Sequence, residues 1–530
     1  ANSSLHDLCS KSHCFHFLQP PTMSHAATDC RCSQHHSEKS SQFLLKSLVT
    51  LFLTFDAAAF NPALGAARSL VRDPTLNSLH TVLVNGQNRR SSRMSDEVGL
   101  PRRSILSSMA AAGTGMLTSG VLPSSASAPR DLQWPNSTLD VSKFPYVLSN
   151  SERKTIRREV GPRIWAFDQN IGIYYVQVPI RMTVVAMDVG GLFVYAPVAP
   201  TRECLALLQP LIDEYGPIRY IILPSVAVEH KVVAGSFARF FPSAEFYATD
   251  KQYSFPVPQL SFRDGLPSWT KPLPVSSRGS EMWGGEFEHQ VLEVKPGPGS
   301  EYQDATFFHK PSKTLLLCDA LYSVSGEPPS ILTSTPTLTR ALLFHARDSP
   351  DELVEDTPEA RRKGWRRIIL LANFFFPGGA KVDLGLGPIA TALKNINYPL
   401  GWGGWLPFNW REGMDVKAFE AYSAKGKPTI FSIIQIILAR GDSGQATQRW
   451  VDTVKQWNFE RVIPAHLDAP LDIGPAQFAE TFDFIRSGSN QVRFCDEDVF
   501  FLRRAEETVL SFSVFKSKLG PLRGKVCGLL

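Results

Sequence analysis

The fold is decided by residues 220–230, YIILPSVAVEH, in which a short apolar run leads into the acid–histidine pair Glu229 and His230. Two later runs also end on a potential metal ligand: TLLLCD at residues 314–319 and RVIPAH at residues 461–466. Continuous β-prone runs of this kind are typical of buried strands in a sheet that is covered on both faces. Because loops converge beyond the strand ends of such sheets, we expect these side chains to gather in one crevice.

The residues around the first run alternate between strand and helix patterns. Thr201 is a predicted N-cap for a helix with an apolar stripe on one face, and a second helix is predicted over residues 231–240, after a turn at the acid–histidine pair. The predicted strands are residues 173–180, 183–187, 192–195, 219–223 and 244–248. This alternation indicates an α/β layered fold. A long insertion separates Asp319 from His466, and Thr357-Pro358 predicts a helix start within it.

Four side chains at these strand ends form the predicted metal site: Glu229, His230, Asp319 and His466. Imidazole and carboxylate ligands suit one hard or borderline divalent ion, and we expect Zn, Fe or Mn. The same four groups also fit a hydrogen-bonded polar cluster that fixes the loops without any metal. Three other histidines lack ligand spacing and are predicted to be packed or on the surface: His289, His309 and His345.

The charge balance of the chain does not indicate a nucleic-acid-binding surface. The chain has 55 Lys and Arg against 50 Asp and Glu, and residues 1–128 account for 11 of the basic and 7 of the acidic residues. Residues 129–530 are therefore almost neutral. Domains that bind DNA or RNA carry a basic patch or stripe, so nucleic acid is not an expected partner.

The first 128 residues follow the order of a tandem targeting sequence. Two lysines precede the apolar run 48–55, and Ala-Ala-Ala-Phe follows at 57–60, as in a secretory signal peptide. Residues 60–103 then hold seven arginines against three acids, which is transit-peptide composition. An arginine pair at 102–103, an apolar stretch and Ala-Ser-Ala at 126–128 are similar to a twin-arginine export signal.

Tandem signals of this kind resemble the presequence of algae with complex plastids, and the resemblance implies the thylakoid lumen as the destination. In the alternative, residues 105–122 form a stromal helix and the arginine pair is accidental. The predicted segments are a signal peptide region at 1–59, a plastid transit peptide at 60–101, a twin-arginine signal at 102–128, a linker at 129–160, a folded domain at 161–510 and a C-terminal tail at 511–530.

Four cysteines remain after the predicted cleavage: Cys204, Cys318, Cys495 and Cys527. None of them forms a CxxC motif, and four scattered cysteines do not make a disulfide scaffold. Cys318 lies inside an apolar run and is predicted to be a small buried residue. A bridge between Cys495 and Cys527 is open as an alternative in an oxidising lumen.

An aromatic segment stands inside the insertion. Residues 398–410 contain five aromatic side chains, three of which are tryptophans: Trp402, Trp405 and Trp410. These tryptophans are candidates for a lid over the site, for core packing, or for a surface that docks on a thylakoid complex. The neighbouring apolar runs at 368–376 and 430–438 are too short to cross a bilayer. No transmembrane span is expected after residue 128.

Together these features resemble the metallo-β-lactamase superfamily: a strand before an acid–histidine pair, a Pro-Gly turn, a strand ending in Asp and a late strand ending in Pro-x-His. More closely, GWRRI at 364–368, WVD at 450–452 and WNFERVIPAH at 457–466 are similar to one branch, a domain of unknown function found in cyanobacteria and plastids. The similarity covers roughly residues 160–510. It implies a four-layer αββα sandwich with a long insertion before the last ligand strand.

The sequence departs from the superfamily's first motif, His-x-His-x-Asp-His. Residues 225–230 read SVAVEH, and the later Pro-Gly-His turn appears as Pro-Gly-Pro at 296–298. The three missing histidines are those of the superfamily's first metal site. The second-site positions keep a ligand type: Glu229, His230, Asp319 and His466. The resemblance therefore implies that one metal site is lost and that the other can survive.

The expected activity is hydrolysis with a single metal ion. Asp319 is the expected catalytic residue, acting both as a ligand and as the base for the attacking water. The sequence does not identify the small substrate. The alternative is a non-catalytic scaffold or assembly protein that uses the same fold to bind a thylakoid complex.

Overall fold

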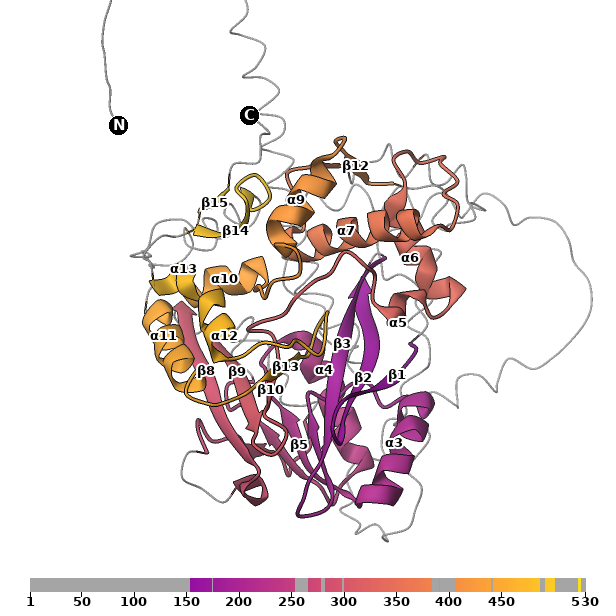
Figure 1. Ribbon diagram of the computed structural model, residues 1–530. Helices are drawn as coiled ribbons and strands as arrows, with labels where there is room; N and C mark the ends of the chain where they lie inside the picture. The colour runs from indigo at the N-terminus through magenta and orange to yellow at the C-terminus, as the bar shows by residue number, and fades with distance from the viewer. Residues whose placement is uncertain are drawn as a thin grey trace, which may run out of the picture. The chain divides into compact units, whose positions relative to one another are not determined.

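The computed structural model describes ten stretches of the chain: residues 153–173, 175–252, 266–277, 282–297, 300–383, 390, 406–439, 442–486, 491–500 and 523–525. The three predicted targeting segments lie outside the described residues, as do most of the predicted linker and tail. The predicted segment boundaries therefore stay predictions. Figure 1 shows the arrangement of the helices and strands.

The first sheet has seven strands, in chain order from one edge to the other. They are β1 (Ile156–Gly161), β2 (Ile164–Ile173), β3 (Val176–Ala186), β4 (Leu192–Tyr195), β5 (Ile218–Leu223), β6 (Glu245–Ala248) and β7 (Lys271–Pro272). β1 to β4 pair antiparallel, and β4 to β7 pair parallel. The parallel part places the end of β5 next to the first turn of the helix that follows it.

The second sheet has four strands in the order β13-β10-β9-β8. They are β8 (Phe287–Gly297), β9 (Ser300–His309), β10 (Thr314–Leu317) and β13 (Arg461–Pro464). β8, β9 and β10 pair antiparallel, whereas β13 returns from the far side of the insertion to pair parallel with β10. Two small sheets lie elsewhere: β11 (Ala380–Val382) with β12 (Phe408–Trp410), and β14 (Gln491–Cys495) with β15 (Arg523–Lys525).

The helices fall into two groups, those that pack on the two sheets, of which α10 and α11 come from the insertion, and those that form a separate core within the insertion. The covering helices are α3 (Arg202–Tyr215), α4 (Val228–Phe240), α10 (Ser432–Ala439), α11 (Ser443–Val454), α12 (Pro475–Thr481) and α13 (Asp483–Arg486), with a short 3-10 helix, η3 (Met282–Gly285), before β8. The others are α5 (Ser330–Thr333), α6 (Pro336–Ala346), α7 (Pro358–Phe374) and α9 (Met414–Ser423).

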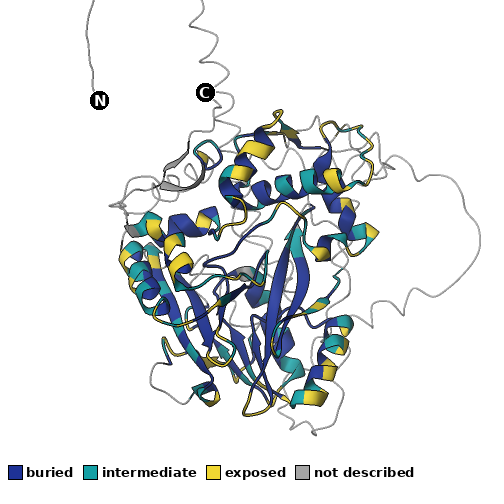
Figure 2. Ribbon diagram, in the orientation of Figure 1, coloured by how far each residue is buried: buried dark blue, intermediate teal, exposed yellow. Residues whose placement is uncertain are grey.

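The buried side chains divide into clusters that define the layers. One cluster joins α3 and α4 to the first sheet, and a second joins α10, α11 and α12 to the second sheet. A third cluster lies between the sheets, where residues such as Phe193 and Phe307 pack with their rings tilted and their centres 5.3 Å apart. Each fully buried side chain of this size contributes about 1.5–3 kcal/mol to folding. The order helix, sheet, sheet, helix confirms the predicted αββα sandwich, and Figure 2 shows the strands buried and the outer helix faces exposed.

The insertion between Asp319 and His466 has its own core. Trp365, Ile368 and Ile369 of α7 pack there with Tyr422 of α9, all buried. Gly364 is required where α6 crosses α7, because a Cβ at that position would lie 1.9 Å from the Leu342 carbonyl oxygen. The GWRRI motif therefore contributes to helix packing.

Several predicted element boundaries are confirmed and two are wrong. Thr201 and Thr357 both cap their helices with side-chain hydrogen bonds, as predicted. The strands expected at 173–180 and 183–187 are one continuous strand, β3, and its antiparallel partner β2 was not predicted, because Asp168, Gln169 and Asn170 of β2 are buried polar residues that hide the strand pattern. The helix expected from residue 231 starts at Val228, which places the acid–histidine pair in its first turn.

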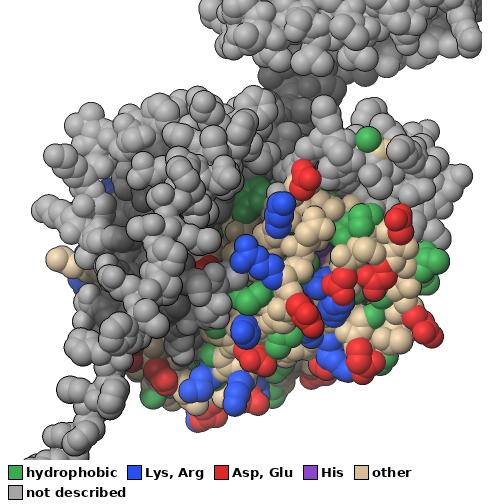
Figure 3. Space-filling view, turned by 90° about the horizontal axis from the view of Figure 1, so that it is seen from above, with side chains coloured by type: hydrophobic (Ala, Val, Ile, Leu, Met, Phe, Trp, Pro, Cys, Tyr) green, Lys and Arg blue, Asp and Glu red, His purple; other side chains and the backbone are tan. Residues whose placement is uncertain are grey.

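No helix among the described residues is long and apolar enough to cross a membrane. On the face drawn in Figure 3, acidic and basic side chains of the described residues are interspersed. Charged side chains of the insertion form ion pairs, for example Lys363 with Asp348 and Arg361 with Asp356. The basic run in α7 is thus compensated locally by acidic neighbours.

Candidate metal centre

Four side chains come together where strands of both sheets end: Glu229, His230, Asp319 and His466. The acid–histidine pair lies in the first turn of α4, directly after β5. Asp319 follows β10 and His466 follows β13, and these strands are parallel neighbours with Leu317 paired to Pro464. One potential ligand atom from each of the four residues lies within 4.8 Å of the others.

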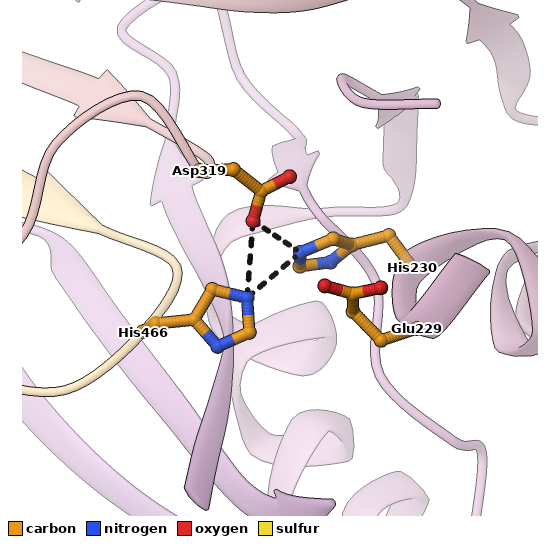
Figure 4. A group of neighbouring side chains, drawn as sticks. All are labelled: Glu229, His230, Asp319 and His466. Carbon is orange, nitrogen blue, oxygen red and sulfur yellow. Dashed lines mark hydrogen bonds and ion pairs between the residues drawn. The ribbon is translucent and has the colours of Figure 1, made fainter. Parts of the chain in front are cut away.

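Three of these atoms form a compact triangle, shown in Figure 4. The Nε2 atoms of His230 and His466 are 3.1 Å apart. Asp319 Oδ1 lies 3.4 Å from His230 Nε2 and 3.2 Å from His466 Nε2. The three side chains are buried, whereas Glu229 is half-buried and its carboxylate is turned toward the triangle. Three of the four side chains are therefore shielded from solvent, and Glu229 is the partly exposed member.

The spacing of the triangle fits a metal ion. Ligand atoms of a tetrahedral zinc site lie about 3.3 Å apart, because each metal–ligand bond measures about 2.0–2.1 Å. The carboxylate oxygen and the imidazole nitrogens offer lone pairs, and lone pairs this close repel unless a cation or a proton lies among them. The donor set and its spacing therefore fit one divalent ion. A single proton shared inside the triangle is the metal-free alternative.

The His466 ring is oriented by the backbone of the first sheet. Its Nδ1 lies 2.9 Å from the carbonyl oxygen of Pro179 in β3. A carbonyl oxygen only accepts hydrogen bonds, so Nδ1 carries a proton, and Nε2 is the nitrogen that faces the triangle; in the neutral ring it presents its lone pair there. Metal-ligating histidines usually donate their second N–H in this way. On its other side the ring meets Phe431, with 6.0 Å between ring centres.

Arg181 anchors the loop that carries His466. Its guanidinium donates to the carbonyl oxygens of Pro464 and Leu467, each at 2.7 Å. The same guanidinium pairs with the buried carboxylate of Asp168 at 2.7 Å. The loop is therefore tied to the first sheet on both sides of its histidine, and a fully buried charge pair supports the tie.

Two polar side chains hold Asp319. The Ser225 hydroxyl donates to Asp319 Oδ2 at 2.6 Å, which leaves Oδ1 for the triangle. Asp304 Oδ2 accepts the backbone N–H groups of Asp319 and Ala320 at 2.7 and 2.8 Å. Ser225 and Asp304 also pair through an isolated β-bridge. The chain before α4 and strand β9 thus meet at the base of this ligand loop.

The charges of the cluster influence one another. Burial would raise the pKa of the Asp319 carboxyl, but His230 and then His466 outweigh it and hold that pKa well below its usual range. Burial would lower the pKa of His466, but Asp319 and then Glu229 raise it overall. Burial, followed by the charge of Asp319, raises the pKa of Asp304 to about 7. Asp319 is therefore ionised and supplies the negative charge that a cation requires.

Sequence patterns did not predict the residues that support the ligands. Asp304 lies in a strand with alternating polar residues, where an acid is typical of the solvent face, and Pro179 contributes only its backbone oxygen. Ser225 stands where the superfamily motif has a histidine, and it binds Asp319 instead. The aromatic residues on both sides of Asp304, Tyr302 and Phe307, are the signal that this acid is buried.

The three other histidines are buried, so their predicted packing is confirmed: His289, His309 and His345. The indole N–H of Trp283 donates to His289 Nδ1 at 3.1 Å, and His289 Nε2 lies 2.8 Å from the carbonyl oxygen of Pro274. Burial lowers the pKa of His289 to about 4. Both ring nitrogens of His289 are thus satisfied within the fold.

The predicted tryptophan surface is described only at Trp410. This residue lies in β12, is half-buried and packs against the core of the insertion, with the Arg367 guanidinium 5.3 Å from its ring centre. Trp402 and Trp405 lie outside the described residues. The lid, core and docking alternatives therefore stay predictions for the segment as a whole.

The cysteines follow two patterns. Cys204 and Cys318 are buried free thiols, as predicted for Cys318, and burial raises the pKa of Cys204 to about 12. Cys495 is disulfide-bonded, and Cys527 lies outside the described residues. None of the three described cysteines belongs to the candidate ligand cluster.

The αββα sandwich, with acid and histidine side chains gathered at its strand ends, is a metallo-β-lactamase-like fold, and the four-residue cluster is its candidate metal site. Residues 162–484 match the family described as Domain of unknown function (DUF4336). The chain belongs to this family. No curated protein matches the chain.

Solved structures similar to this one include metallo-β-lactamases. DIM-1 metallo-β-lactamase is 12% identical, with 63% of this chain and 99% of that chain covered and a TM-score of 0.32. A metallo-β-lactamase from Hirschia baltica is 11% identical, covering 63% and 98%, with a TM-score of 0.31. The Flv1 flavodiiron core from Synechocystis is 9% identical, covering 64% and 62%, with a TM-score of 0.31.

Proposed function

We propose that this protein is a hydrolase that uses one divalent ion, Zn, Fe or Mn, held by four side chains: Glu229, His230, Asp319 and His466. The observation that carries the proposal is the triangle of two Nε2 atoms and one carboxylate oxygen, with sides of 3.1, 3.2 and 3.4 Å. Buried polar clusters normally pair donors with acceptors. Here the Nδ1 proton of His466 is bonded to the Pro179 carbonyl oxygen, and Nε2 faces the ionised carboxylate of Asp319.

The site's own residues divide the work of binding and proton transfer. A divalent ion lowers the pKa of bound water from about 16 to about 7 and polarises a carbonyl or phosphoryl oxygen. Asp319 presents Oδ1 to the triangle while Ser225 keeps Oδ2 occupied, so one oxygen is oriented for ligation and for accepting a proton. Glu229 is the half-buried member, and we place the approach of water and substrate on its side. Esters, thioesters and phosphodiesters are the substrate classes to screen.

For the location, we propose the thylakoid lumen of a plastid. The support is the order of the N-terminal signals: a hydrophobic run, an arginine-rich segment, then an arginine pair before Ala-Ser-Ala. A fluorescent fusion to the full chain tests this in an alga with complex plastids. We expect signal from the plastid and protection from protease in isolated intact thylakoids. Cytosolic signal would contradict the proposal.

The experiment that tests the function is elemental analysis of the purified protein, with Asp319→Ala as the test variant. We expect about one equivalent of Zn, Fe or Mn in the wild type and none in the variant. The matched control is Glu286→Ala, because Glu286 is another buried carboxylate, accepts two backbone N–H groups and lies 3.6 Å from His309 Nε2. This control should retain the metal.

If the Asp319→Ala variant retained the metal, the metal would be bound at another site and the proposed ligand set would be wrong. A wild type that takes up no metal after reconstitution would leave the scaffold alternative, in which the cluster shares one proton. In that case the search would turn to a partner from the thylakoid, with the full chain as the bait. Hydrolysis of any screened substrate by the loaded wild type, lost in Asp319→Ala, would establish the enzyme.

A further inference from the structure

We propose that Asp304 and Ser225 are positioning residues of the metal centre, which together fix the direction in which Asp319 presents its ligand oxygen. The inference rests on the proposed metal site and concerns how that site is built. It arises from two residues outside the ligand set, brought together from β9 and from the loop after β5. Ser225 bonds the other carboxylate oxygen of Asp319 and Asp304 accepts its backbone N–H, so both act through Asp319.

Asp304 controls the backbone of the ligand loop. Its Oδ2 accepts the N–H groups of Asp319 and Ala320, the first two residues after Cys318 at the end of β10. These N–H groups are buried, and an unpaired buried N–H costs about 1–3 kcal/mol. Asp304 itself is fully buried. The carboxylate therefore serves as a fixed cradle that sets where the Cα of Asp319 stands.

Ser225 controls the side chain. Its hydroxyl donates to Asp319 Oδ2 at 2.6 Å and accepts the N–H of Ala227 at 3.1 Å. With Oδ2 occupied, rotation about the carboxylate would break this bond, so Oδ1 stays on the side of the two imidazoles. The backbone N–H of Val226 also reaches Gln303 O, and Ala305 N reaches Pro224 O, so the loop and β9 move as one unit.

The two supports differ in what a substitution can remove. Asp304→Asn keeps a carbonyl oxygen that can accept both N–H groups, whereas Asp304→Leu is similar in size and accepts neither. Ser225→Ala removes only the hydroxyl. Loss of an outer partner of a metal ligand typically lowers metal affinity by about 10–100-fold. We expect losses in that range for Asp304→Leu, about tenfold for Ser225→Ala, and at most a few-fold for Asp304→Asn.

The test is titration of the full chain with Co²⁺ alone, followed by visible absorption, which reports the geometry around the ion. Thermal unfolding of each metal-free variant shows whether it is folded. The proposal is supported if Asp304→Leu and Ser225→Ala bind more weakly with an altered spectrum, while Asp304→Asn restores both. It is overturned if folded Asp304→Leu and Ser225→Ala keep the wild-type affinity and spectrum.

Two further outcomes are distinguishable. If Asp304→Leu does not fold, the pair Ser225→Ala and Asp304→Asn decides, and wild-type behaviour of Ser225→Ala overturns the proposal. If the wild type itself gives no cobalt spectrum, the proposed metal function fails and this inference falls with it. The failure of the inference alone therefore looks different from the failure of the function.

Discussion

His466 and His289 are both buried histidines that lie 2.9 and 2.8 Å from a proline carbonyl oxygen, yet their second nitrogens face different groups. The second nitrogen of His289 accepts a hydrogen bond from the Trp283 indole N–H, so the neutral ring has a hydrogen-bond partner at both nitrogens. The second nitrogen of His466 faces Asp319 and His230, which bring an acceptor oxygen and another ring nitrogen. The comparison teaches that burial alone does not mark a candidate ligand; a second ring nitrogen that faces an ionised carboxylate and another imidazole nitrogen does.

The largest effect is expected when each of these rings is removed. His466→Ala should lower metal affinity by more than the 10–100-fold typical of losing an outer partner, because a ligand is lost. His289→Ala should leave metal binding unchanged and lower the free energy of unfolding by about 2–4 kcal/mol, because a buried ring that stacks on Phe307 is deleted. Metal titration and urea unfolding of both variants measure this. Equal metal affinity in the two would remove the distinction between the rings.

The anchoring of His466 is tested next with Arg181→Met. This change leaves Asp168 buried and removes two bonds to the loop, so we expect a loss of about 3 kcal/mol of unfolding free energy and weaker metal binding. Arg158→Met is the matched control. Arg158 also pairs with Asp168, but its side chain is 35% exposed, so we expect a loss of about 1 kcal/mol or less. Similar losses in urea unfolding would contradict the role given to Arg181.

The sequence predicted which four side chains gather at the strand ends better than it predicted the residues around them. Asp319 and His466 follow continuous apolar runs, a pattern that identifies buried strand ends whatever the rest of the fold. The acid–histidine pair was placed in a turn because Ala227 offers no capping side chain and α4 starts without one. These predictions depend only on residues that are adjacent in the chain, so a short apolar run is enough to make them.

The supporting contacts depend on distant parts of the chain. Pro179 lies 287 positions before His466, and only the packing of β3 against the final strand loop brings its oxygen to the ring. The buried polar residues of β2 hid that strand because their partners, such as Arg181 and Ala199, lie in other elements. Such contacts form only in the tertiary fold, so the spacing of residues in one sequence does not predict them.

A pH dependence separates the two histidine environments further. The pKa of His289 falls from its ordinary 6.5 to about 4 on folding because of burial. The unfolded state therefore binds more protons between these values, so the stabilisation is complete above pH 6.5 and is lost as the pH falls toward 4. We expect the titration of His289 to lower the free energy of unfolding by about 2 kcal/mol between pH 7 and pH 5.

The variant His289→Gln isolates this contribution. Glutamine can accept from the Trp283 N–H and donate to the Pro274 oxygen, but it does not titrate in this range. Urea unfolding of both proteins at pH 7 and pH 5 gives the difference, in which other titrating groups cancel. The wild type should lose more stability than the variant on acidification. Parallel losses would mean that His289 is protonated in the folded state.

The smallest expected effect comes from Trp283→Phe, which removes the indole N–H that satisfies His289 Nδ1 and the few ring atoms that go with it. A typical intramolecular hydrogen bond contributes about 0.5–1.5 kcal/mol, and we expect a loss of unfolding free energy near 1 kcal/mol, together with a small cavity cost. The freed Nδ1 also makes His289 easier to protonate in the folded state, which brings its pKa closer to the unfolded value, so the stability of this variant should fall less steeply with acid than that of the wild type. Metal affinity should not change, because Trp283 packs between the sheets among Phe193 and Phe307 and has no contact with the ligand triangle. A variant that lost metal instead would show that the inter-sheet core and the strand-end cluster are coupled, and the contrast between the two histidines would then have to be redrawn as one connected network.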